Sequence, residues 1–296
     1  MRINNNITAI NSHRQYAINN NSIAKNVEKL SSGYRVNRAA DDAAGLAISE
    51  KMRAQIRGLN MGSKNAQDAI SLVQTAEGAL QSVHDILQRM RELSVQSASD
   101  TNETSIDRAA LDLEFQELLR EIDQTADLTE FNTQKLINGR WDPDDTVHNP
   151  GNEVLTIQAG ANEESSNQMT ITIAAMSASG LKLATGTASA GTLVELYNIR
   201  TDAVTSRQAL DAINSAINTI SMQRARLGAV QNRLEFRIQN LDISAENLQA
   251  AESRIRDVDM AKQMTEFTKN NILFQASTAM LAQANALPQG VLQLLG

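Results

Sequence analysis

A heptad repeat of apolar residues in the last third of the chain restricts the fold more than any other feature. Alternating steps of three and four between residues 196 and 259 visit 19 positions, of which 14 are apolar, whereas the hydrophobic content of 42% predicts about eight. This spacing is typical of a coiled-coil helix, which at 1.5 Å per residue would extend over roughly 95 Å. We therefore expect an elongated, mainly α-helical protein built as a bundle of long helices.

A capping box predicts where this helix begins. Thr192 and Glu195 have the Thr-x-x-Glu spacing, directly before Leu196. In such a box the hydroxyl and the carboxylate each satisfy a backbone N–H that would lack a partner in the first turn. We expect the long helix to begin at Leu196.

Three further amphipathic helices are predicted in the first half of the chain. The first covers residues 3–30, has an Asn-rich polar face, and stops at Ser31, Ser32 and Gly33. The second runs from about residue 42 to 97 with a stripe wide enough for two neighbours, formed by Ala66, Ala69, Ile70, Val73, Ala76, Leu80, Val83, Leu87 and Met90. The third carries Leu111, Phe115, Leu118 and Ile122, and its short connection predicts antiparallel packing on the second.

The middle of the chain, residues 128–191, is richer in turn residues and holds six of the 14 Gly. Residues 154–159 and 168–174 predict a β-hairpin across the polar loop 162–167, because apolar and polar residues alternate in the second segment. We expect this loop and residues 182–190 to face solvent.

Both ends of the chain carry apolar residues that need partners. The carboxyl end continues the helical pattern through Ile272, Leu273, Ala276, Met280 and Leu281, then passes Pro288 and Gly290 to an apolar segment at residues 291–295. Each end helix is too narrowly apolar to be stable alone. Pairing with copies from neighbouring molecules would bury these faces.

Composition excludes several classes of partner and chemistry. The formal net charge of −7, without a Lys/Arg run, disfavours nucleic acid and anionic membrane surfaces. The chain has no Cys, which excludes disulfides, thiolate zinc sites and Cys nucleophiles. It has no signal-peptide pattern and no 18-residue apolar run, so we expect export, if it occurs, without a cleaved signal.

Chemical motifs are weak, and we expect no enzyme activity, no cofactor and no metal. His13, His84 and His148 lack zinc-ligand spacing. A calcium loop would use Asp142, Asp144, Thr146 and Glu153, but Val147 replaces the required Gly and two Pro fall inside, so a polar turn is favoured. Asp41 and Asp42 precede a helix, where carboxylates cap backbone amides, and this role is favoured over a catalytic pair.

Both terminal thirds of the chain contain long, specific motifs of one family. Residues 30–59 read LSSGYRVNRAADDAAGLAISEKMRAQIRGL, followed by NAQDAISLVQTAEGAL and LQRMRELSVQSA. The other end contains RARLGAVQNRLE, ENLQAAESRIRDVDMA and AMLAQANALPQGVLQLL. With these motifs the chain closely resembles the bacterial flagellins, and only the middle is left unmatched.

The resemblance implies a subunit of a helical filament, the propeller of swimming bacteria. Residues 1–42 and 256–296 would form the terminal helices of an inner filament tube, 43–127 and 192–255 a helical bundle domain, and 128–191 a central β-hairpin and variable surface segment. Inner-tube contacts would come from Ile3, Ile7, Ile10, Ile23, Val27, Leu30, Ile272, Leu273, Met280, Leu281, Val291, Leu292, Leu294 and Leu295.

The resemblance also implies how the protein is exported and what it meets. A flagellin passes unfolded through the flagellar type III secretion channel and folds at the filament tip. Its partners would be copies of itself, the filament cap, hook-associated junction proteins and an export chaperone. Arg89, Leu93, Gln96 and Glu114 match positions bound by the flagellin-sensing Toll-like receptor of vertebrates. We expect these four residues to form an exposed patch whose primary role is packing between neighbouring protofilaments.

Two other classes of protein compete with this interpretation. A hook-filament junction protein shares the terminal helices, but the dense match in LAISEKMRAQIRGL and the small middle segment disfavour it. A coiled-coil signalling protein would need a membrane segment or a continuous helical hairpin, and the predicted β-hairpin and apolar last residues disfavour that class.

Overall fold

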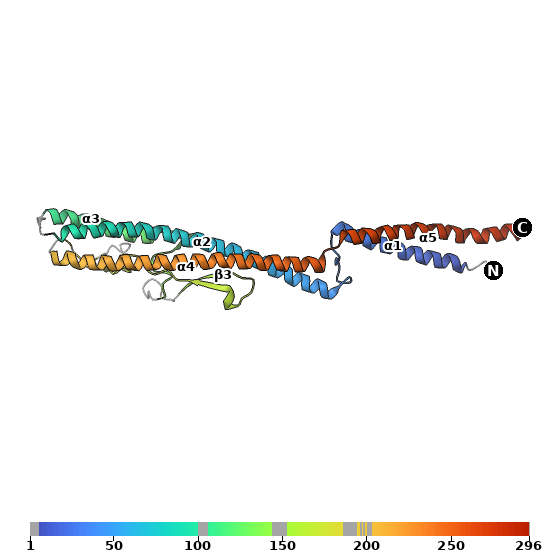
Figure 1. The fold of residues 1–296 in the computed structure, drawn as a ribbon, viewed down its shortest axis with the longest axis horizontal. Coiled ribbons are helices and arrows are strands. Elements are labelled where there is room, and N and C mark those ends of the chain that lie inside the picture. The colour runs from blue at the N-terminus through green and yellow to red at the C-terminus, as the bar shows by residue number, and fades with distance from the viewer. Residues whose placement is uncertain are drawn as a thin grey trace. The chain divides into compact units, whose positions relative to one another are not determined.

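The structure is a computed structural model that describes residues 6–99, 106–143, 153–185, 194–195, 197, 199 and 203–295. Long α-helices form most of this part of the chain, and the short strands pair into two-stranded antiparallel sheets (Figure 1). The mainly α fold with a small central β region is confirmed. The chain divides into two compact units, Met1–Ile56 with Glu246–Gly296, and Arg57–Ala245, called unit 1 and unit 2 below.

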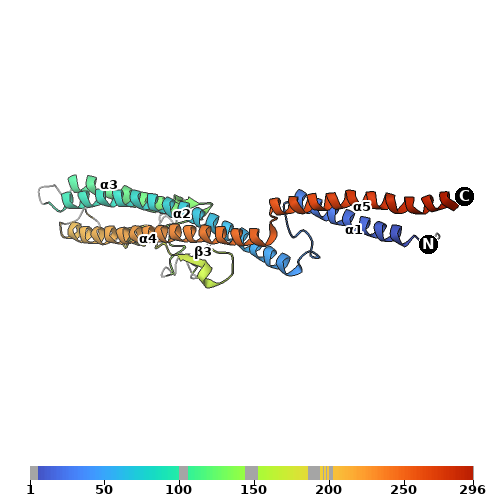
Figure 2. The same cartoon turned by 45° about the vertical axis from the view of Figure 1, so that its right-hand side comes forward.

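Unit 1 contains helices from opposite ends of the chain. Helices α1 (Ile7–Ser32) and α5 (Met260–Leu295) lie side by side in both views (Figures 1 and 2). Unit 1 also holds the beginning of α2 (Ala43–Ser97) and the end of α4 (Ala203–Arg256). Helix α5 continues past Pro288 and Gly290 to Leu295.

Local signals account for the helix ends of unit 1. The Asn6 side chain accepts a hydrogen bond from the Ala9 N–H at 3.1 Å and caps α1. Gly33 ends α1 in the left-handed conformation, with a φ of 75°, and donates its N–H to the Lys29 carbonyl. The Asp42 carboxylate accepts the Gly45 N–H at 2.8 Å, which confirms its capping role. Asp259 similarly receives the N–H groups of Ala261 and Lys262 at the start of α5.

Unit 2 packs the remainder of α2 and α4 with α3 (Asp107–Leu128) and the strands. The predicted stripe of α2 is confirmed, since all its members except the partly buried Ile70 are buried. On α4 the buried residues follow heptad spacing and are Ser206, Ala209, Ile213, Ala216, Ile220, Gln223, Leu227, Leu234, Leu241 and Ala245. The buried positions from Ser206 to Leu241 that are seven apart match one half of the predicted heptad repeat. In the other half, Ala245 matches, whereas Ala209, Ala216 and Gln223 each lie one residue before the predicted position. Gln223 donates to the Thr172 carbonyl of the β region.

The predicted start of the long helix is wrong. Helix α4 begins at Ala203, and Val194–Glu195 forms strand β6, paired with β5 (Ala184–Thr185). Backbone pairing with β5 replaces the capping role predicted for Glu195, and Thr192 lies outside the described residues.

The predicted β-hairpin is confirmed as β3 (Leu155–Gln158) and β4 (Gln168–Ile171), paired in register from Leu155 with Ile171 to Gln158 with Gln168. The 3-10 turn η1 (Ser165–Asn167) precedes β4, and a smaller hairpin joins β1 (Glu130–Phe131) to β2 (Gln134–Lys135).

The middle segment contributes to the core of unit 2 as well as to its surface. Buried residues of this segment include Leu136, Ile137, Trp141, Ile171, Ile173 and Met176. The expectation that residues 182–190 face solvent is wrong for Leu183 and Ala184, which are buried, while residues 186–190 lie outside the described part. These apolar side chains cover the faces of the long helices, so the segment is part of the packed unit.

Candidate assembly interface

Polar residues form the contact between α1 and α5. The Asn19 amide donates to the Ser277 hydroxyl at 2.7 Å and to the Leu273 carbonyl at 3.3 Å. Further along α1, the Asn26 side-chain oxygen accepts a hydrogen bond from the Gln263 amide at 2.8 Å. Asn19 and Asn26 are the buried residues of α1 and face α5, whereas Asn11, Asn20 and Asn21 of the same helix are exposed.

Aromatic and backbone contacts extend this pairing. The rings of Tyr16 and Phe274 lie 4.9 Å apart between centroids. Nearer the chain ends, the Asn6 amide donates to the Ala284 carbonyl at 2.7 Å. Positions early in α1 therefore lie beside positions late in α5, which defines an antiparallel pair.

Large apolar side chains lie on the outside of this helix pair. Ile10 and Met280 are each 62% exposed. Of the predicted inner-tube residues, Ile7, Ile10, Val27, Ile272, Leu273 and Met280 are exposed, and Ile23, Leu30 and Leu281 are partly buried. Ile3 and the side chains of Val291, Leu292, Leu294 and Leu295 lie outside the described residues. The pair thus buries polar groups and exposes apolar ones, the reverse of an ordinary helix pair in water.

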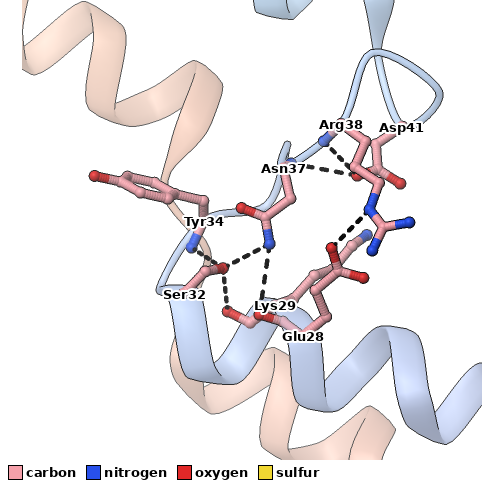
Figure 3. A network of polar contacts seen from close by, with 7 residues as sticks. All are labelled: Glu28, Lys29, Ser32, Tyr34, Asn37, Arg38 and Asp41. Carbon is pink, nitrogen blue, oxygen red and sulfur yellow. Dashed lines mark hydrogen bonds and ion pairs between the residues drawn. The ribbon is translucent and has the colours of Figure 1, made fainter.

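The connection between α1 and α2 is held by a compact polar network (Figure 3). Asp41 accepts the backbone N–H groups of Arg38 at 3.1 Å and Asn37 at 3.2 Å. The Asn37 amide donates to the Ser32 hydroxyl at 2.8 Å, and Arg38 pairs with Glu28 at 2.9 Å. Hydrogen bonds from Arg38 and then Asn37, together with Lys29 and Lys25 nearby, hold the pKa of Asp41 below its ordinary value.

This connection also binds the connection between α4 and α5. Tyr34 and Asp257 form an isolated antiparallel bridge, and the N–H of Arg35 donates to the Arg256 carbonyl at 2.7 Å. The Arg256 guanidinium lies 4.7 Å from the Tyr34 ring centre and donates to Glu50 at 2.8 Å. Residues 32–41 and 256–258 are called the joint below. Through these contacts the joint connects the α1–α2 loop with the α4–α5 loop within unit 1.

The patch predicted on α2 is only partly exposed. Arg89 is bonded to Glu114 of α3 at 2.8 Å, so the expected pairing of these helices is confirmed. Arg89 also bonds Glu92 at 3.1 Å, and the hydrogen bonds with Glu114 and Glu92 raise the pKa of its guanidinium. Gln96 is exposed.

Leu93 does not lie on this surface, contrary to the prediction. It is 1% exposed and belongs to the core cluster of unit 2. The helical spacing of Arg89 and Leu93 is correct, but residues four apart are offset around the helix, and the core covers the Leu93 side.

Sequence reasoning missed the polar contacts of α1 with α5 and most of the joint. The sequence does contain a signal for the contacts between α1 and α5, because Asn19 and Asn26 are seven residues apart, which is the spacing of contact positions in a coiled coil. Tyr34, Asn37, Arg38 and Arg256 carry no spacing that predicts their contacts.

The described part of the chain offers little support for a metal site. Within it, no group of three or more His, Cys, Asp or Glu side chains lies close enough together to bind a metal ion. Asp144 and Thr146 of the calcium-loop pattern and His148 lie outside that part, and Asp142 accepts the Ala175 N–H at 3.2 Å. None of the helices described is long and apolar enough to cross a membrane.

Comparison with known proteins matches the chain along its full length. The model of the bacterial flagellin N-terminal helical region matches residues 3–142, and that of the C-terminal helical region matches residues 210–295. The flagellins of Halalkalibacterium halodurans and Bacillus subtilis are 55% and 53% identical over 295 and 307 residues, and each alignment covers 100% of both chains. The flagellar filament 33 kDa core protein of Treponema phagedenis is 46% identical with the same coverage. Among solved structures, Bacillus cereus flagellin is 33% identical, with 64% of this chain and 94% of that chain covered and a TM-score of 0.46.

Long helices with apolar outer faces, together with these matches, define a structural protein of the bacterial flagellum. The chain belongs to the bacterial flagellin family, and its function is that of a structural subunit of the flagellar filament.

Proposed function

We propose that copies of this chain polymerise through the outward faces of α1 and α5, which line the inner tube of the filament. The observation that carries this proposal is the set of exposed apolar side chains on these two helices, beside a polar contact between them. Burial of apolar surface contributes about 25 cal/mol per Å². Neighbouring copies of the same pair would supply that burial.

Polymerisation of surface variants tests the proposal. Ile10→Asn and Met280→Asn each place an amide where an apolar contact is expected, so both should hinder filament formation, observed by electron microscopy and sedimentation. Ile10→Leu and Met280→Leu are the matched controls and should polymerise normally. Filaments of ordinary length from both Asn variants would refute this role for the two faces.

Export is the second part of the proposal. The chain leaves the cell unfolded through the flagellar type III secretion channel, assisted by an export chaperone, and assembles beneath the filament cap on hook-associated junction proteins. Narrow apolar faces on α1 and α5 support this, since such helices depend on neighbours for stability. Cells lacking the channel should retain the protein, and equal amounts in the medium with and without the channel would refute this route.

The surface formed by Arg89, Gln96 and Glu114 is proposed as a contact between protofilaments and as a binding surface for the vertebrate flagellin-sensing Toll-like receptor. The Arg89 side chain is 51% exposed and pairs with Glu114, so it offers a charged anchor at this surface. Arg residues often dominate the binding energy of an interface. Arg89→Ala should weaken the binding of the monomer to the receptor and should destabilise filaments. If receptor affinity and filament stability were both unchanged, this surface would have neither proposed role.

A further inference from the structure

The polar residues between α1 and α5 recur at the heptad period on both helices. Ser12, Asn19 and Asn26 follow one another at intervals of seven on α1, as do Gln263, Asn270 and Ser277 on α5. Four of these, Asn19, Asn26, Gln263 and Ser277, are between 6% and 9% exposed and are called the polar seam below. A heptad of polar residues on one face marks the positions where an ordinary coiled coil places Leu or Ile.

The residues of the polar seam form individual hydrogen bonds between α1 and α5. Asn19 reaches the Ser277 hydroxyl and the Leu273 carbonyl, and Gln263 reaches the Asn26 oxygen. Each bond joins residues more than 230 apart in the chain, so each depends on one alignment of the two helices. Sliding α5 by one turn of four residues, roughly 6 Å, would replace Ser277 beside Asn19 by Leu281 and Gln263 beside Asn26 by Phe267.

Stability alone does not explain buried amides here. The Asn26 Nδ2 atom is buried and has no hydrogen-bond partner within the described part of the chain. An unsatisfied buried donor costs about 1–3 kcal/mol, and apolar residues of similar shape would avoid that cost. Meanwhile Ile7, Ile10, Ile272 and Met280 are exposed, and apolar attraction is non-directional. Without the polar seam, the apolar faces of α1 and α5 could pack against each other as readily as against neighbouring copies.

We propose, on the basis of the assembly function above, that the polar seam determines the specificity of self-assembly: it fixes the register of α1 against α5 and keeps their apolar faces outward for neighbouring copies. A slip of α5 by one turn places Leu281 and Phe267 beside the amides of Asn19 and Asn26, and inverted pairing removes their partners as well, so the penalty of unpaired buried amides rejects these arrangements. The seam therefore contributes specificity, at a cost in the stability of the isolated pair.

Substitutions at one seam pair test the role of the amides in the full-length protein. Asn26→Leu and Gln263→Leu alone each leave one amide unpaired, and each should raise the concentration needed for polymerisation about tenfold. The exchange variant Asn26→Gln with Gln263→Asn keeps two amides and should polymerise like the unmodified protein. The double variant Asn26→Leu with Gln263→Leu should pair its helices but assemble poorly or out of register.

Disulfide trapping measures the register directly, because the chain has no Cys of its own. Asn19→Cys with Ser277→Cys reports the observed alignment, and Asn19→Cys with Leu281→Cys reports a slip of one turn. With Asn26 and Gln263 intact, only the first combination should cross-link efficiently in filaments, since Cα atoms more than about 7 Å apart cannot be bridged. With Leu at both positions, the slipped cross-link should increase about tenfold.

The outcomes separate this inference from the proposed function. An unmodified protein that forms no filaments would refute the proposed function itself. Filaments from the unmodified protein, combined with a Leu double variant that assembles normally and gives only the observed-register cross-link, would overturn the seam inference alone. Equal failure of the exchange and Leu double variants would also overturn it, because the amides would then have no special role. Failure of the Leu double variant with normal assembly of the exchange variant supports it.

Discussion

Arg89 and Leu93 are four residues apart on α2 and have opposite environments. Arg89 bonds Glu114 at the surface, whereas Leu93 is enclosed by the core of unit 2. The sequence was sufficient to predict the first contact, because helical spacing and a short connection bring α3 beside α2. It could not predict the burial of Leu93, which depends on segments distant in the chain.

The burial of Leu93 predicts a large effect on stability. Leu93→Ala should lower the free energy of unfolding of unit 2 by about 2–5 kcal/mol, because it removes a fully buried side chain. Val95→Ala, at an exposed position of the same helix, is the control and should change it by no more than about 0.5 kcal/mol. Fluorescence of Trp141, the single tryptophan, reports urea unfolding of this unit. Equal effects of the two variants would show that Leu93 is not a core residue.

Asp41 predicts a pH-dependent contribution of the joint to filament stability. Because hydrogen bonds from Arg38 and Asn37 lower its pKa in the folded state, its contribution is present above the ordinary carboxyl pKa of about 3.9 and is lost as pH falls through the lowered value. Asp41→Asn filaments should therefore dissociate at a lower temperature than unmodified filaments at pH 7. The difference should shrink in strong acid, and a constant difference from pH 7 to pH 2 would contradict this role.

At the scale of elements, periodicity was sufficient to predict most helices and the main hairpin. Buried residues on α2 and α4 recur with the predicted spacing, and β3 pairs with β4 as expected. The start of α4 was not predictable from Thr192 and Glu195, since the local capping signal competes with pairing between β5 and β6. Pairing between strands is a non-local interaction, and local patterns carry little information about it.

The docking of the β3–β4 hairpin on α2 gives a prediction for Gly62. A Cβ there would lie 2.9 Å from the Gly160 backbone nitrogen, so Gly62→Ala should destabilise unit 2 by about 1–3 kcal/mol despite the higher helix propensity of Ala. Gly78, on the same helix, has no such neighbour, and Gly78→Ala should stabilise the unit by up to about 1 kcal/mol. Urea unfolding of both variants decides this, and a stabilising Gly62→Ala would mean that the hairpin does not contact α2 there.

At the scale of the whole molecule, the sequence predicted that both ends need partners but not how they contact each other. The sequence predicts an Asn-rich polar face on the first helix, which includes Asn19 and Asn26, and polar residues are usually exposed. Both are instead buried against α5, and large apolar side chains of α1 and α5 are exposed. In the assembly proposed above, neighbouring copies would cover these apolar faces.

The last residues of the chain should matter for assembly rather than for unit 2. Deleting residues 291–296 removes four apolar side chains that are expected in the inner tube, so filament growth should be weakened or abolished. Urea unfolding of unit 2, followed by Trp141, should remain unchanged. Normal filaments from the truncated protein would exclude these residues from the interface.

Amide hydrogen exchange of α1 and α5, compared between monomer and filament, tests the central claim most directly. We expect the amides of these two helices to exchange rapidly in the monomer and to become protected in the filament, because neighbouring copies then cover their outward faces. The core amides of unit 2 should be protected in both states. Equal protection of α1 and α5 before and after assembly would contradict the claim that these helices form the subunit interface.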